Sequence, residues 1–313
     1  MPPVLGPPGN LGEAESREIT SLAVSCYRYY SLHAGYGRRE KPSRGSMSRP
    51  TAALPDFESP PIIEALLGVE FAPLPGFGIP HLGLFWRVVR SDYPKYSVHP
   101  SLASKSDLDA RTPMIQIVGA PALRGWFVDE PETRLLQLQD TRFVHNWRKV
   151  SGMEAYPRYE DSIRPTFEKE WSRFIRFLHG EKIAGPEVVE CEVTYINHLE
   201  RGREWQEFAD VGRMLTVWRN GESNTLLAKA KHVTLQATYP MAKDGTLAVT
   251  LQPGVRNRDA KEILQLQLSA KGKPSSSATE DLMEYFDHAH EWVVRGFADV
   301  TTPEMHRLWG RKR

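Results

Sequence analysis

Hydrophobic and polar residues alternate along two stretches of the chain, and each stretch predicts a β-strand. Over residues 62–71 the odd-numbered positions are apolar, whereas Glu64 and Glu70 lie on the opposite side, because successive side chains of a strand point to opposite faces. Residues 189–195 repeat this pattern, again with glutamates between the apolar positions. Laying Glu64 on Glu190 superimposes the two apolar faces at an offset of 126 residues.

Two further matches occur at a similar separation. The motif Leu-Leu-Gln-Leu-Gln at 135–139 recurs as Ile-Leu-Gln-Leu-Gln at 263–267, 128 residues later. A Glu-Trp pair at 170–171 recurs at 291–292, 121 residues later, within a second long helical pattern. Three matches in one order predict an internal duplication. The repeated unit has roughly 125 residues, which is a normal domain size.

The first unit is expected to continue from its opening strand into a helix, two strands and a long helix. Apolar residues at helical spacing between 82 and 89 indicate the first helix. Strands are predicted over 122–128 and 134–143. The long helix carries an apolar stripe from 163 to 178, and Pro165 predicts that it is kinked or restarts near its beginning.

The second unit repeats this order. A helix is predicted over 205–215, and strands over 229–239, 246–251 and 262–269, the first two joined by a hairpin turn at Asp244-Gly245. Ser277 and Glu280 have the spacing of a capping box, and they precede a long helix with an apolar stripe over 282–297. A last short helix is expected to begin at Thr301 or Thr302, with Pro303 in its first turn.

Together these elements predict an α+β fold of two similar β-α-β-β(-β)-α units with antiparallel sheets, TBP-like or helix-grip-like. Joining the two sheets edge to edge would bury exposed strand edges. The units are assigned to residues 47–182 and 183–313. Residues 1–46 are rich in proline and lack sustained periodicity, so a disordered extension is expected there. Met1 and Met47 are alternative translation starts.

Charge and cysteine content narrow the classes of partner. The 40 basic and 39 acidic residues give a net charge of +1, which argues against nucleic-acid binding because such proteins normally show a clustered basic excess. The sequence has no apolar run of the ~20 residues that span a bilayer, so no membrane association is expected. Two cysteines cannot build a disulfide framework. A cytoplasmic location is therefore expected, with Cys191 as a small core residue.

Three groups of motifs carry a family resemblance. They are Leu-Pro-Asp-Phe-Glu-Ser-Pro-Pro-Ile-Ile-Glu at 54–64, Asn-Trp-Arg at 146–148 with Tyr-Pro-Arg-Tyr at 156–159, and a C-terminal helix rich in Phe and Trp over 288–309. With them the chain resembles a sporadically distributed bacterial TIGR family of uncharacterised proteins. The resemblance implies kinship from about residue 54 to residue 309, and it supplies no activity.

The segment from Arg142 to Arg148 is the candidate functional segment. It is predicted to run off the end of a strand into a loop, where a rigid sheet positions binding residues. The candidate binding residues are Arg142, Asn146, Trp147, Arg148 and Tyr156. In the alternative interpretation, Asn146 and Arg148 cap backbone groups and carboxylates while Trp147 fills the core. Ordinary structural uses of a buried tryptophan and a paired arginine favour this alternative.

Motifs of phosphate-binding loops and of the hydrolase nucleophile elbow do not occur in the sequence. No catalytic residue, metal site or cofactor is therefore predicted, and an enzyme is less favoured than a binding protein. The expected function is non-enzymatic binding or assembly, in an accessory or mobile-element system, with a protein partner or through self-association. The alternative is a small-ligand-binding protein or an enzyme with a pocket between sheet and long helix.

Overall fold

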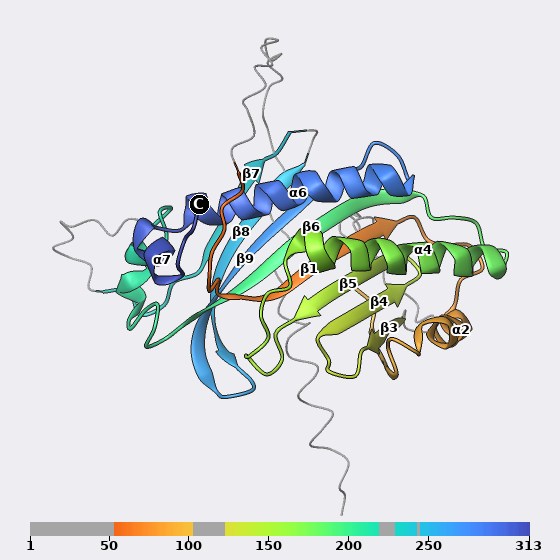
Figure 1. Ribbon diagram of the computed structural model, residues 1–313, viewed down its shortest axis with the longest axis horizontal. Helices are drawn as coiled ribbons and strands as arrows, with labels where there is room; N and C mark the ends of the chain where they lie inside the picture. Colours follow the sequence, from red (N-terminus) through yellow and green to blue (C-terminus); the bar gives the residue numbers. More distant parts are fainter. Residues whose placement is uncertain (1–52, 103–122, 219–228, 243–244) are drawn as a thin grey trace, which may run out of the picture.

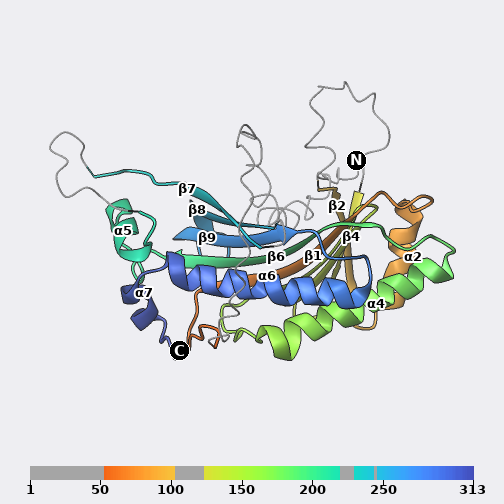
Figure 2. The same cartoon turned by 90° about the horizontal axis from the view of Figure 1, so that it is seen from above.

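One antiparallel sheet of nine strands organises the protein (Figure 1). The computed structural model describes residues 53–102, 123–218, 229–242 and 245–313. The strand order is β2-β3-β4-β5-β1-β6-β9-β8-β7. Among the described residues, α2, α4 and α6 pack on one face of this sheet, as Figure 2 shows from above. The α+β class is therefore confirmed.

The elements follow each other along the chain in a regular order. The strands are β1 (Ile62–Phe71), β2 (Lys95–Pro100), β3 (Leu123–Val128), β4 (Arg134–Gln139), β5 (Arg142–Arg148), β6 (Val188–Glu200), β7 (Leu235–Pro240), β8 (Thr246–Arg256) and β9 (Lys261–Gly272). The helices are α2 (Ile79–Val89), the π-helix η1 (Tyr159–Ile163), α4 (Arg164–Gly180), the 3-10 helix η2 (Phe208–Asp210), α5 (Val211–Met214), α6 (Thr279–Val300) and α7 (Pro303–Leu308).

The two strands predicted from alternation, β1 and β6, lie side by side at the centre of the sheet. They pair antiparallel, with Leu67 opposite Val193. Both side chains are fully buried on the helix-bearing face, as is Cys191. The pairing shifts register between Ile62 and Glu64 and again between Glu70 and Phe71, once near each end. The alternation and the core position predicted for Cys191 are confirmed.

The segment over 134–148 differs from the prediction. Residues 134–143 are not one strand, and residues 142–148 are not a loop: the chain turns at Asp140 and Thr141 and returns as β5, paired with both β4 and β1. The turn contains no glycine. Instead, its backbone is held by the end of β1, since Phe71 N–H donates to the Thr141 carbonyl and Leu74 N–H to the Asp140 carbonyl.

Two predictions for the second unit are also wrong. The sequence match between 135–139 and 263–267 makes β4 and β9 equivalent strands of the two units. In the sheet they are not equivalent, because β9 lies next to β6, the first strand of its unit, whereas β5 separates β4 from β1. The helix expected over 205–215 is reduced to η2 and α5. The hairpin between β7 and β8 forms as expected, although Asp244 of its turn lies outside the described residues, as do residues 1–46.

Helix boundaries show which capping signals operate. Pro165 stands in the first turn of α4, directly after η1, so the predicted restart is confirmed. Thr302 caps α7 and accepts a hydrogen bond from Met305 N–H. The capping box at Ser277 is wrong: α6 has Ala278 as N-cap, and the Ser277 hydroxyl accepts from Val188 N–H instead. Among the described residues no helix has both the length and the apolar character needed to cross a membrane.

Candidate functional site

Strand alternation divides the predicted binding residues between the two faces of the sheet. Arg142, Asn146 and Arg148 point away from the helices, onto the side that we call the helix-free face of the described structure. Trp147 lies between two of them in sequence and therefore points to the helix side, where its ring contacts Tyr156 edge to face at 5.7 Å. The five residues consequently form two separate groups.

An ion-pair row crosses the four central strands on the helix-free face. Arg142 of β5 pairs with Glu70 of β1 and lies 3.5 Å from Glu192 of β6, which in turn pairs with Lys271 of β9 at 3.2 Å. The side chains of Arg142, Glu70 and Glu192 are less than one-tenth exposed. Burial alone would raise the pKa of Glu192, but Lys271 and Arg142 overcome it and lower the pKa to about 2.

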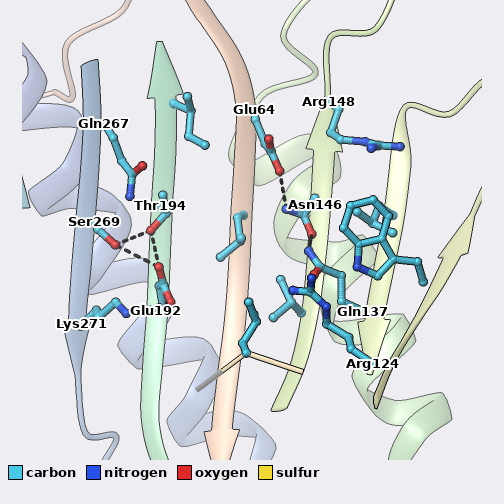
Figure 3. Close-up of a pocket in the computed structure, with 16 residues that line it drawn as sticks. Glu64, Arg124, Gln137, Asn146, Arg148, Glu192, Thr194, Gln267, Ser269 and Lys271 are labelled. Carbon is cyan, nitrogen blue, oxygen red and sulfur yellow. Dashed lines mark hydrogen bonds and ion pairs between the residues drawn. The ribbon is translucent and has the colours of Figure 1, made fainter. Parts of the chain in front are cut away.

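Hydroxyl groups complete the shell of Glu192. Thr194 donates to its carboxylate at 2.6 Å and Ser269 at 3.0 Å, as the left part of Figure 3 shows. Each of these hydroxyls comes from a different strand, β6 and β9. The carboxylate is thus held ionised by two cations and two neutral donors, which is how a buried charge is normally stabilised.

A second polar row lies parallel to the first, nearer the start of β1. Asn146 donates to Glu64 and accepts from Gln137 at 2.8 Å (Figure 3). Burial raises the pKa of Glu64, although the nearby Arg148 opposes this effect. Arg148 is half-buried and donates to the Glu132 carbonyl at 2.9 Å. Asn146 therefore contacts a carboxylate, that of Glu64, as the structural interpretation of this residue expects.

Several buried polar atoms on this face of the described structure have no hydrogen-bond partner. Three of them are the indole N–H of Trp126, the Oε1 of Gln137 and the Nε of Arg148. Buried polar groups are nearly always paired, so each orphan atom calls for an explanation. Two of these atoms are donors and one is an acceptor. A guest that both accepts and donates hydrogen bonds would satisfy them.

Comparisons with protein-family models, with curated proteins and with solved structures find no match for this chain.

Tyr156, on the helix side of the sheet, borders a cavity of about 540 Å³ between the sheet and α6. The Tyr156 and Tyr195 hydroxyls share a hydrogen bond of 2.6 Å there, and the Tyr159 ring stacks on His290 at 3.8 Å. Burial lowers the pKa of His290 to about 4, so this imidazole is neutral at physiological pH. Residues 54–60 form another wall of the same cavity.

Sequence reasoning missed most of the partners of the candidate residues. Glu70, Glu192 and Gln137 are central to the two polar rows, yet the sequence marked the glutamates only as the polar sides of their strands. That polarity was the available signal, but strand pairing alone brings the charges together. Among the described residues, no group of three or more His, Cys, Asp or Glu side chains is arranged to hold a metal ion.

Proposed function

We propose that this chain is a non-enzymatic binding protein that holds a polypeptide partner on the helix-free face of its sheet. The single observation that carries the proposal is the set of orphan atoms on Trp126, Gln137 and Arg148. A peptide backbone supplies carbonyl acceptors and N–H donors side by side, and so matches a face that offers both kinds of group.

The charge pattern of this face supports a polypeptide over a polyanion. Cations and carboxylates alternate across the strands, and the central ones neutralise each other in pairs such as Arg142–Glu70 and Lys271–Glu192. Nucleic acid requires a surplus of Lys and Arg facing its phosphates. The partly exposed Leu66 lies between the polar rows and would pack against a partner's side chains.

The proposal for the fold is that the sheet arose by duplication, as a TBP-like pair of units. Leu67 and Val193, which the 126-residue offset relates, face each other in the central strand pair. The same offset relates the register shift after Ile62 to the one near Val188. The strand order is also alike when it is followed outward from the centre. In the first unit β1 is followed by β5, β4, β3 and β2, and in the second unit β6 is followed by β9, β8 and β7. Such a likeness concerns the fold and transfers no function.

We also propose membership of the sporadic bacterial family, and with it a role in an accessory or mobile-element system. Parts of the three motif groups support this, since residues 54–60, Tyr156, Tyr159 and His290 border one cavity. The partner is sought among the proteins encoded by the neighbouring genes. Self-association is the variant of this proposal in which the partner is a second copy.

The test is selection of displayed random peptides on the purified full chain. Wild type is expected to enrich a related set of peptides, and Gln137→Leu, which removes the free acceptor, should lower their recovery at least tenfold. Gln236→Leu makes the same change on the exposed edge strand β7 and should leave recovery unchanged. Circular dichroism confirms that each variant is folded. Absence of enrichment, or equal recovery by Gln137→Leu, would refute the proposal.

The helix-side cavity favours a second candidate function, binding of a small ligand between sheet and α6. Its volume lies in the range of ligand sites, and its walls combine apolar side chains with many polar and charged ones. Val294 borders this cavity, and Val294→Trp fills it. If the cavity takes ligands, the variant should lose the stabilisation that uncharged aromatic fragments give to wild type in thermal melts. If fragments stabilise both proteins equally, this candidate is wrong.

A further inference from the structure

A separate cavity of about 400 Å³ lies between β3 and the tip of the β8–β9 hairpin. We call it the hairpin cavity. Its walls include Trp126 and Val128 of β3, Arg148 and Lys149 at the end of β5, His198 of β6, and Arg258 of the hairpin. It adjoins the helix-free face but has its own volume, which falls within the range of small-molecule sites.

In the described structure, five cations line this cavity (Lys95, Arg148, Lys149, Arg256 and Arg258) against two carboxylates, Glu64 and Glu132. Arg256 is matched, because Glu200 and Asp259 each hold it at 2.6 Å. Within the described part of the chain, the carboxylate that pairs with Arg258 is the same Asp259, at 3.8 Å. Among the described residues, Lys149 forms no ion pair within 4.0 Å. Lys149 and Arg258 therefore bring to the hairpin cavity positive charge that contacts within the described residues offset only in part, through Asp259 and, at longer range, Glu154.

The pKa values of two basic groups at this cavity, Lys149 and His198, are lowered. Burial lowers the pKa of Lys149, and the nearby Arg258 lowers it further. Burial also lowers the pKa of His198 to about 4, with Arg256 and then Arg258 adding to the effect. Glu154 and then Glu200 oppose the lowering of the Lys149 pKa, and the hydrogen bond with Gln265 and then Glu200 oppose the lowering of the His198 pKa. An anion in the cavity would remove the repulsion that these groups share.

Unpartnered buried groups also border the hairpin cavity. The Trp126 side chain is 2 % exposed and its indole N–H has no acceptor. His198 is 6 % exposed; it is hydrogen-bonded to Gln265, and its Nδ1 has no partner. A guest oxygen would accept from Trp126, while the indole ring and Val128 offer apolar contact to a ring system.

We propose that the hairpin cavity binds a small molecule that carries a carboxylate or phosphate group on an apolar, ring-containing body. Lys149 and Arg258 hold the anionic group, and Trp126 contacts the ring and donates its N–H. The size of the cavity fits one small molecule rather than a polymer. The proposal goes beyond peptide binding. The two proposals share the Trp126 N–H, but the cations that hold the anionic group, Lys149 and Arg258, are not part of the two polar rows.

Saturation-transfer NMR and thermal melts of the full chain test this with three probes: phenyl phosphate, benzoate and uncharged benzyl alcohol. Either aromatic anion should bind and raise Tm, and the tighter of the two identifies the group as phosphate or carboxylate. Benzyl alcohol should bind at least fivefold more weakly than the tighter anion. Binding by neither anion, or equal binding of the alcohol, would overturn the proposal.

Variants then locate the bound anion. Lys149→Met and Arg258→Met should each weaken binding of the tighter anion at least fivefold, whereas Arg176→Gln, on exposed α4 surface, should leave it unchanged. Without ligand, Lys149→Met should melt no lower than wild type because it removes a repelled charge. This variant carries the test if Arg258→Met fails to fold. Unchanged affinity in Lys149→Met would place the anion elsewhere and refute the assignment.

Discussion

Replacement of Arg142 by methionine is the sharpest test of the buried ion-pair row. The change removes the cation that faces both Glu70 and Glu192 while keeping most of the apolar stem. All three side chains are less than one-tenth exposed, so the variant leaves two buried carboxylates with weakened compensation. Breaking a buried pair in this way costs about 3–5 kcal/mol of unfolding free energy.

The pKa of Glu192 reflects the whole row, with Lys271 acting more strongly than Arg142. A fall from 4.5 to about 2 corresponds to about 3 kcal/mol, at about 1.36 kcal/mol per pKa unit. Because the folded-state pKa is depressed, this stability is present above pH 4.5 and is lost as the pH falls towards 2. In Arg142→Met the pKa of Glu192 rises, although Lys271 remains, and the loss of stability on acidification becomes smaller.

Urea unfolding of both proteins at pH 7 and at pH 3 measures these effects. The control is Arg213→Met, which breaks the ion pair between Arg213 and Glu304. Their side chains are 62 % and 41 % exposed, respectively, so this variant should lose less than about 1 kcal/mol of unfolding free energy. A cost below about 1 kcal/mol for Arg142→Met at pH 7, or the same pH dependence as wild type, would refute the assignment of a buried, coupled row.

Three further outcomes follow from the contacts described. Arg148→Ala should cost only about 1–2 kcal/mol in urea unfolding, because this half-buried side chain donates to one carbonyl, that of Glu132; a cost near 5 kcal/mol would mean a fully buried charge. Thr302→Ala should cost about 1 kcal/mol through loss of the α7 cap, and Thr302→Ser should restore most of it. The Cys191 thiol is buried and its pKa is raised, so iodoacetamide at pH 8 should modify it only after unfolding. Because the chain has a second cysteine, Cys26, peptide mass mapping locates the label, and rapid labelling of Cys191 in the native protein would contradict its core position.

The sequence by itself determined the features that depend on local periodicity and local backbone chemistry. Alternation in β1 and β6 specified which side chains face the core, because a strand has only two faces and one of them is buried. Pro165 and Thr302 marked helix starts through their own conformational and hydrogen-bonding preferences. The α+β class followed from these elements.

Only the tertiary structure decided where the chain turns and which charges meet. The turn at Asp140 and Thr141 has no glycine signal and is held by hydrogen bonds from the distant end of β1, so no local pattern could reveal it. That turn makes Arg142 part of a strand between two others, and pairing across β1, β5 and β6 then brings it to Glu70 and Glu192. Long-range strand pairing supplied these partners, since residues far apart in sequence become neighbours only when the sheet forms.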